Sequence, residues 1–91
     1  MTITNFLAPD LWLREDGGPR YLQLRQRISD SVDQAVLSPG KPLPPEREIA
    51  TITTLSRVTV RKAIQALVKD GLIIQKHGSG SFIAIHTPKI E

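Results

Sequence analysis

The chain has 91 residues, a formal net charge of +3 and no cysteine, which predicts one small domain without disulfides or thiolate-metal sites. Its apolar runs are too short to span a membrane, and its N-terminus lacks a signal-peptide pattern. Two histidines, His77 and His86, are too few for a zinc site. We therefore expect a cytoplasmic protein that uses no metal and no cofactor.

The positive charge is concentrated in one part of the chain. Residues 41–80 carry seven basic and three acidic side chains, whereas the remainder carries five basic and six acidic ones. This distribution indicates a polyanion as the partner, because a basic surface attracts phosphates. Ordinary solubilising surface charge is the alternative, and it predicts no such segregation.

Residues 1–18 show no sustained hydrophobic periodicity and contain Pro9 and the turn-forming cluster Asp16-Gly17-Gly18. This composition is typical of a flexible N-terminal arm. Trp12 interrupts it. Because tryptophan is usually largely buried, we expect Trp12 to pack on the domain or on a partner.

A first helix is predicted to begin at Pro19, because proline suits the first helical turn. The turn-forming Ser38-Pro39-Gly40 ends this helix near Leu37. Between these limits, apolar residues recur at helical spacing and form one stripe that faces a core. The stripe comprises Tyr21, Leu24, Ile28, Val32, Ala35 and Val36.

A second, short helix is predicted from Glu46 to about Thr53, where early carboxylates complement the helix dipole. Residues 41–44, before it, are expected to be extended, because residues that precede proline avoid the α region. We expect Ile49 to face inward and Arg47 to lie on the outer side, where it would contact a phosphate or a base edge.

The segment from Ser56 to Asp70 has the strongest helical pattern. Ser56 is a favourable N-cap, and Gly71 suits the left-handed position that ends a helix. The apolar residues recur at i, i+3, i+4, i+7 and i+8 and form a buried stripe of Val60, Ala63, Ile64, Leu67 and Val68. The opposite side is mostly basic and carries Arg57, Val58, Arg61, Lys62, Gln65 and Lys69.

The outer side of this third helix matches what the major groove of DNA requires. Arg57 and Arg61 lie one turn apart near its N-terminus, and each guanidinium can bond guanine O6 and N7. A tight turn at Thr53-Thr54-Leu55 joins it to the second helix, as in a helix-turn-helix. We interpret residues 57–69 as a recognition helix. The alternative is an ordinary helix with a solvated basic face.

Two strand-like segments follow, residues 72–76 and 81–85, both rich in β-branched side chains. The stretch His77-Gly78-Ser79-Gly80 between them is predicted to be a hairpin tip. Because it has little bulk, and Lys76 lies at its base, we interpret it as a wing at the minor groove. A phosphate-binding loop is disfavoured, since this glycine-rich stretch opens no helix. Residues 86–91 are expected to be a tail or the start of a linker.

Four ordered blocks of the sequence resemble the N-terminal domain of GntR-type bacterial transcription regulators. The resemblance covers Pro19 to Ile83, about seven-tenths of the chain, and the order and spacing of the blocks make it specific. The blocks are residues 19–24 (PRYLQL), 37–50 (LSPGKPLPPEREIA), 55–64 (LSRVTVRKAI), and 71–73 (GLI) with 78–83 (GSGSFI).

The resemblance implies an α+β fold, a winged helix-turn-helix of three helices and a C-terminal β-hairpin. It implies a sequence-specific regulator, which we expect to be a repressor, that binds a pseudo-palindromic operator in double-stranded DNA as a homodimer. The family's DNA-contacting arginines match Arg47, Arg57 and Arg61. Its phosphate-bonding hydroxyls match Ser56 and Thr59.

The wing-tip positions that reach the minor groove in the family match His77 and Gly78. With the residues chosen for their positions on the recognition helix and the wing, the predicted DNA-binding set has thirteen members. They are Arg47, Ser56, Arg57, Val58, Thr59, Arg61, Lys62, Gln65, Lys76, His77, Gly78, Ser79 and Gly80.

Regulators of this family carry a C-terminal domain that binds a small-molecule effector and holds the dimer together. By the resemblance, residues 19–85 form the DNA-binding domain, residues 1–18 an arm, and residues 86–91 a tail or the start of a linker to an effector domain that this chain does not include. The opening and the wing are most similar to the HutC-type subgroup.

The sequence departs from the family pattern at three places. Pro45 stands where serine or alanine is usual, which removes an N-cap side chain. Thr54-Leu55 replaces the commoner Gly-Val of the turn, which puts the usual turn geometry in doubt. Val58 offers no hydrogen bond, and would instead meet a thymine methyl group.

Two other classes of function predict different sequence features. A winged-helix protein-interaction module without DNA specificity would present an apolar or mixed outer face on the third helix, unlike the basic one here. An enzyme is disfavoured, because Glu46 and Glu48 are two residues apart on a helix and do not face each other. No nucleophile, base and orienting partner are grouped in the sequence.

Overall fold

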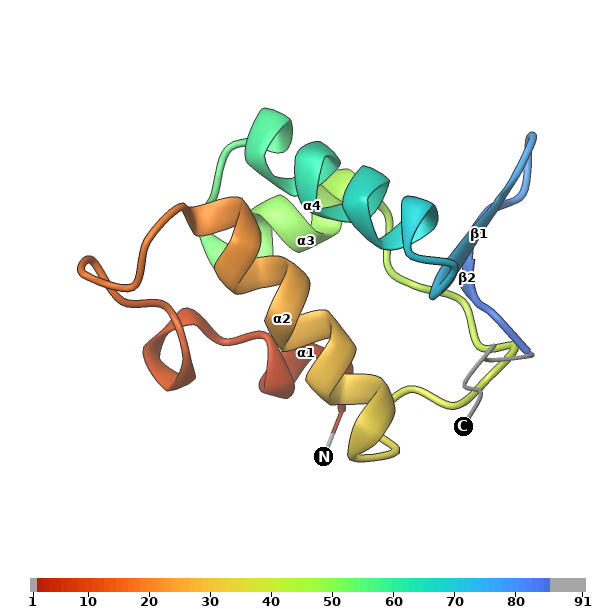
Figure 1. The fold of residues 1–91 in the computed structure, drawn as a ribbon, viewed down its shortest axis with the longest axis horizontal. Helices are drawn as coiled ribbons and strands as arrows, with labels where there is room; N and C mark the ends of the chain where they lie inside the picture. The colour runs from red at the N-terminus through yellow and green to blue at the C-terminus, as the bar shows by residue number, and fades with distance from the viewer. Residues whose placement is uncertain (1, 86–91) are drawn as a thin grey trace.

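The computed structural model describes residues 2–85, which fold into a helical body with a β-hairpin at one end (Figure 1). The predicted winged helix-turn-helix is confirmed. None of the helices in the described part of the chain has the length and hydrophobicity that a bilayer crossing requires. The elements are α1 (Ile3–Phe6), the 3₁₀ turn η1 (Pro9–Leu11), α2 (Arg20–Asp33), α3 (Glu46–Thr53), α4 (Arg57–Lys69), β1 (Ile73–Lys76) and β2 (Gly80–Ile83).

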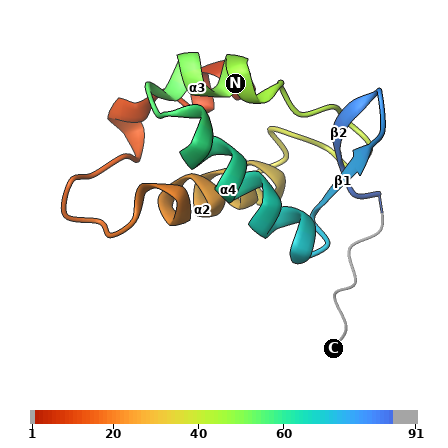
Figure 2. The ribbon, with the colours of Figure 1, turned by 90° about the horizontal axis from the view of Figure 1, so that it is seen from above.

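Helix α4 is the element that the others contact. It packs against α2, α3 and β1, and Figure 2 shows it lying between α2 and α3 with its C-terminal end beside the hairpin. Four of the five apolar positions predicted for its stripe are buried, and Val68 is half-buried. The core also takes apolar side chains from the other elements, namely Leu24, Ile28, Leu37, Leu43, Ile49, Leu55, Ile73 and Ile83.

The predicted caps of α4 are confirmed. The Ser56 hydroxyl oxygen accepts a hydrogen bond from the Thr59 amide at 3.1 Å. At the other end, Gly71 has a φ of +84°, and the amides of Gly71 and Leu72 donate to the carbonyls of Val68 and Leu67, each at 3.0 Å. This pair of bonds is a Schellman motif, which satisfies two carbonyls at the helix end.

Helix α2 is shorter than predicted, because it ends at Asp33 rather than near Leu37. Ala35 adopts a φ of +61°, and the amides of Val36 and Leu37 both donate to the Ser31 carbonyl, at 2.8 and 3.1 Å. The backbone therefore leaves the helix early and turns Leu37 into the core. Helical spacing of apolar residues beyond Asp33 predicted a continuation that this turn replaces.

The wing is a two-stranded antiparallel sheet in which Ile73 pairs with Ile83 and Lys76 with Gly80. Strand β1 begins one residue later than the predicted 72–76. Strand β2 begins one residue earlier than the predicted 81–85 and ends two residues earlier. Residues 40–43 run along the free edge of β2 and share three backbone hydrogen bonds of 2.8–2.9 Å with its Ser81 and Ile83. The extended segment predicted at 41–44 thus anchors the wing to the start of α3.

The N-terminal segment differs from the flexible arm predicted for residues 1–18. Within it, α1 and η1 form, and Phe6 and Leu7 are buried in the core region. The Trp12 indole donates to the Leu7 carbonyl at 3.0 Å, so Trp12 packs on its own domain. Elements of one turn each are too short to give a hydrophobic period, which is why the sequence showed no pattern there.

Two side chains of α2 hold this segment in place. The Arg27 guanidinium lies 3.6 Å from the centroid of the Phe6 ring and donates to the Phe6 carbonyl at 2.9 Å. The Gln23 amide bonds both the amide and the carbonyl of Arg14, each at 2.9 Å. The segment is therefore tied to α2 by polar contacts as well as by burial. Residues 86–91, predicted to be a tail or the start of a linker, lie outside the described residues.

We expect Leu7→Ala to lower the free energy of unfolding by about 2–5 kcal/mol, because Leu7 is fully buried and alanine leaves a cavity. Urea denaturation of the two proteins measures the difference. Leu11→Ala is the matched control in the same segment, since Leu11 is 53% exposed. Equal stability of the Leu7 variant and the parent chain would mean that the segment adds nothing to the core.

Candidate nucleic-acid interface

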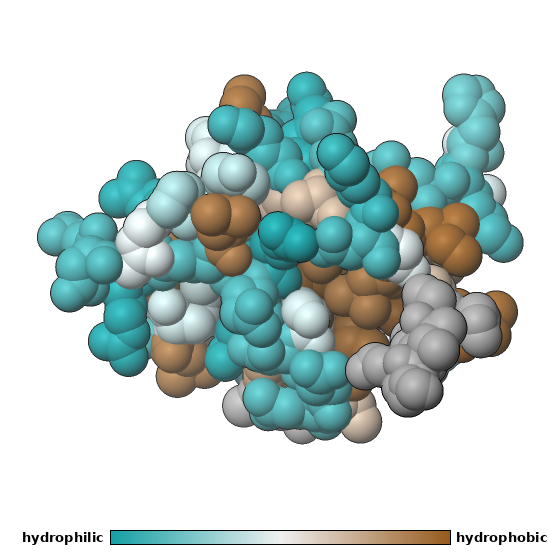
Figure 3. Space-filling model, viewed as in Figure 1, coloured by the Kyte–Doolittle hydropathy of each residue, from teal (hydrophilic) through white to brown (hydrophobic). Residues whose placement is uncertain are grey.

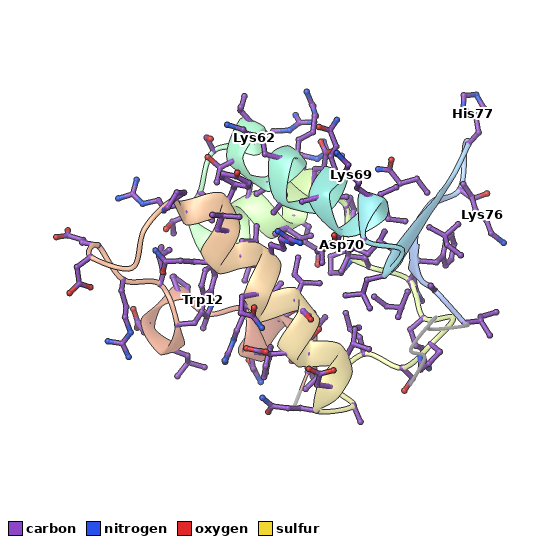
Figure 4. All side chains as sticks on the ribbon, in the orientation of Figure 1. Trp12, Lys62, Lys69, Asp70, Lys76 and His77 are labelled. Carbon is purple, nitrogen blue, oxygen red and sulfur yellow. The ribbon has the colours of Figure 1, made fainter. Side chains whose placement is uncertain are left out.

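The thirteen predicted site residues lie on α3, on α4 with its N-cap Ser56, and on the hairpin. All are exposed except Thr59, which is half-buried. Figure 4 shows Lys62 on α4 and His77 at the hairpin tip along the same edge of the molecule, with Trp12 well away from it. The corresponding edge of the space-filling view is mostly hydrophilic (Figure 3). The structure therefore brings Lys62 and the hairpin tip to the same edge of the fold (Figure 4).

The outer side of α4 is set by its buried stripe. At 100° per residue, Val58, Gln65 and Lys69 point directly away from the core. Val58 is 66% exposed and is the apolar member of this outer row. These three side chains are exposed and accessible to another molecule.

Arg61 projects from α4 toward α3. Its Nε and Nη2 atoms donate to Oε1 of Glu46, at 3.3 and 3.2 Å. Glu46 is the first residue of α3, and its side chain is 24% exposed against 52% for Arg61. The pair joins the two helices of the helix-turn-helix on the outer surface. Sequence reasoning did not include Glu46 in the site, because the two residues are fifteen positions apart.

Lys62 projects to the other side of α4, toward α2. Its Nζ atom lies 5.0 Å from the centroid of the Tyr21 ring, which is within the range of a cation–π contact. Tyr21 was predicted only as part of the buried stripe of its helix, and it is half-buried. Tyr21 therefore also contacts a predicted site residue, Lys62. No local feature of the sequence predicted this contact.

A groove of about 400 Å³ runs between the start of α3 and the hairpin. It brings together four predicted site residues from three elements: Arg47, Arg57, Ser79 and Gly80. These residues are far apart in the sequence. Their convergence shows that the wing and the helix-turn-helix form one continuous surface.

The hairpin tip is open to solvent. Gly78 and Gly80 have φ values of +80° and +103°, which favour glycine at both positions. A Cβ atom added at either would meet no atom within 4 Å. The space around the tip is therefore free for the close approach of another backbone.

At the base of the hairpin, the Nζ atom of Lys76 lies 5.6 Å from the centroid of the Phe82 ring.

The hydroxyls at the start of α4 have distinct partners. Ser56 donates to Thr59 Oγ1 at 2.9 Å, and its oxygen also caps the helix. The Ser56 proton is thus already used within the protein. The Thr59 hydroxyl receives this bond and keeps its own proton for an outside acceptor.

The turn between α3 and α4 keeps a left-handed residue without glycine. Thr54 has φ 62° and ψ 20°, a conformation that is uncommon for a β-branched side chain. The Thr54-Leu55 departure from the family pattern therefore changes the residue but not the need for a left-handed turn. Leu55 is buried and holds the turn against the core.

The model of the gntR family of bacterial regulatory proteins matches residues 20–83. The chain belongs to the GntR family. Its match begins at α2 and ends with β2, so α1 and η1 lie outside the region that the family model describes.

Curated relatives agree with this family. The chain is 44% identical over 73 residues to the uncharacterized HTH-type transcriptional regulator YurK of Bacillus subtilis. The aligned residues cover 80% of this chain and 29% of YurK. The chain is 43% identical over 63 residues to the probable fructoselysine utilization operon transcriptional repressor of Escherichia coli, covering 69% and 26%. The matched region is thus under a third of each relative's length.

The chain is also similar to solved structures of other proteins. A transcriptional antiterminator from Listeria monocytogenes has a TM-score of 0.77 and 36% identity, over 84% of this chain and 57% of that one. The DNA-binding domain of AraR in complex with operator ORX1 has a TM-score of 0.72 and 38% identity, over 79% and 87%.

We expect Thr54→Gly to raise the free energy of unfolding by about 1 kcal/mol, because strain of about 1–3 kcal/mol is relieved and part is offset by glycine's unfolded-state entropy. The melting temperature should then rise by roughly 4–8 °C. Thr51→Gly is the control, since Thr51 lies within α3, where glycine relieves no strain and should lower stability. A lower melting temperature for Thr54→Gly would show that the turn stores no strain.

Proposed function

We propose that this chain is the sequence-specific DNA-binding part of a transcriptional regulator, with α4 in the major groove and the hairpin at the minor groove. The main support is the protein groove that Arg47, Arg57, Ser79 and Gly80 line together. This groove joins α4 and the hairpin, which would enter adjacent grooves of DNA, into one basic surface.

Within this surface the arginines and the hydroxyls would have different tasks. Arg57 and Arg61, one turn apart on α4, are suited to bidentate contacts with guanine. Arg47 lies at the start of α3, where it would clamp a phosphate or reach a base edge. Thr59, with its free hydroxyl proton, would bond a phosphate and so fix the register of the helix on the duplex.

The likeness to AraR bound to operator DNA supports DNA as the partner. The name of the fructoselysine operon relative supports repression as the mode of regulation. The relatives are transcriptional regulators, and we propose no enzymatic activity. A regulator of this kind would act in the bacterial cytoplasm, where its DNA lies.

The oligomer and the effector rest on the family resemblance. We propose a homodimer on a pseudo-palindromic operator and a small-molecule effector that binds a C-terminal domain, in a regulator of HutC type. The chain spans only 26–29% of the length of the curated relatives it matches. The division into residues 1–18, 19–85 and 86–91 stays a prediction.

A protein-interaction module is the alternative function. It would use an apolar or mixed outer side on α4, whereas the exposed side chains there include Arg61, Lys62, Gln65 and Lys69. A gel shift of the chain with a pool of random duplexes separates the two functions. Selection of bound duplexes from that pool then gives the operator half-site and its symmetry.

Binding to the selected duplex should weaken steeply as salt is added, because phosphate contacts release condensed cations. A plot of the logarithm of affinity against the logarithm of salt concentration should have a slope of about −0.9 per phosphate neutralised. Fluorescence anisotropy across a salt titration measures it. The proposal fails if the chain binds no duplex even at low ionic strength.

Arg61→Ala should cost about 1–3 kcal/mol of discrimination between the selected duplex and a scrambled one, if Arg61 bonds guanine in a bidentate manner. Thr59→Val is the comparison, since loss of a phosphate contact should weaken both duplexes about equally. The ratio of the two dissociation constants reports discrimination. An unchanged ratio for Arg61→Ala would show that Arg61 reads no base.

A further inference from the structure

One carboxylate lies within the basic surface that would meet DNA. Glu46 lines the groove that holds Arg47 and Arg57, and it accepts two hydrogen bonds from Arg61. Because phosphates are negative, a carboxylate here opposes general attraction to DNA. Its presence in the interface therefore calls for a role other than affinity.

The contact fixes which part of the Arg61 guanidinium is available. A guanidinium has a side edge, formed by Nε and one terminal nitrogen, and an end, formed by the two terminal nitrogens. Glu46 takes the side edge, at 3.3 Å from Nε and 3.2 Å from Nη2. The end keeps two parallel donors, the arrangement that matches O6 and N7 of guanine.

We infer that Glu46 is a positioning residue for base readout: it holds Arg61 so that the guanidinium end faces the major groove, and it disfavours a contact of Arg61 with phosphate. This inference rests on the proposed function. By this inference, Glu46 raises the discrimination between DNA sequences and lowers the affinity for DNA of any sequence.

The alternative is a purely structural ion pair. The pair is partly exposed, at 52% for Arg61 and 24% for Glu46, and exposed pairs contribute little to stability. Glu46 also complements the N-terminus of α3. A structural role would change the melting temperature and leave discrimination between duplexes untouched, so the two roles have different readouts.

The test compares E46Q with E48Q in the 91-residue chain. Both remove one negative charge from the first turn of α3, but the described side chains include no ion pair or hydrogen-bond partner for Glu48. The probes are a duplex selected from a random library and its scrambled counterpart. Dissociation constants for both duplexes and the melting temperature of each variant are measured.

E46Q should lower the ratio of selected to scrambled affinity about tenfold, as expected for the loss of one bidentate base contact, and should bind the scrambled duplex more tightly than the parent does. E48Q should leave the ratio within about twofold of the parent, which bounds the effect of charge alone. In the R61A background, E46Q should change the ratio no further, because the side chain that it positions is gone.

An unchanged ratio of selected to scrambled affinity for E46Q would overturn the inference. So would a tenfold loss of this ratio when E46Q is added to R61A, or the same loss in E48Q. Each of these results leaves the proposed function intact, provided that the parent chain prefers the selected duplex. A parent chain without any preference would instead overturn the proposed function, and the role of Glu46 with it. The melting temperatures show whether a variant has lost binding by unfolding.

Discussion

The burial of one side of α4 is the constraint on which the rest of the structure depends. Its stripe from Val60 to Leu67 packs against α2, α3 and β1, so the helix can neither rotate nor slide without exposing apolar side chains. The rotation of α4 in turn decides which side chains face outward. A recognition surface on this helix is therefore precise to the extent that the core behind it is well packed.

Two contacts at the sides of α4 further restrict the side chains of that surface. Arg61 leans toward α3 and bonds Glu46, whereas Lys62 leans toward α2 and lies near the Tyr21 ring. Between them remains the outer row that begins with Val58. The long cationic side chains of α4 thus differ in freedom. The restrained Arg61 is suited to reading a base.

Two further segments, residues 40–43 and the N-terminal segment, extend the domain beyond the helix-turn-helix. Residues 40–43 bond to β2 and tie the wing to the start of α3. The N-terminal segment adds Phe6 and Leu7 to the buried residues and is held by Gln23 and Arg27. It is thereby packed against α2.

The sequence by itself determined the local features: the helical period of α4, its Ser56 and Gly71 caps, the bounds of α3, the wing tip and the exposure of twelve of the thirteen site residues. Each depends on neighbours within a turn or two, where spacing and residue type suffice. Only the tertiary structure decided where α2 ends, how the N-terminal segment packs, and that Glu46 and Tyr21 border the site. Most of those features are contacts between residues distant in the chain, and the early end of α2 is a turn that brings Leu37 into the core. They depend on how the buried surfaces fit together, which periodicity does not encode.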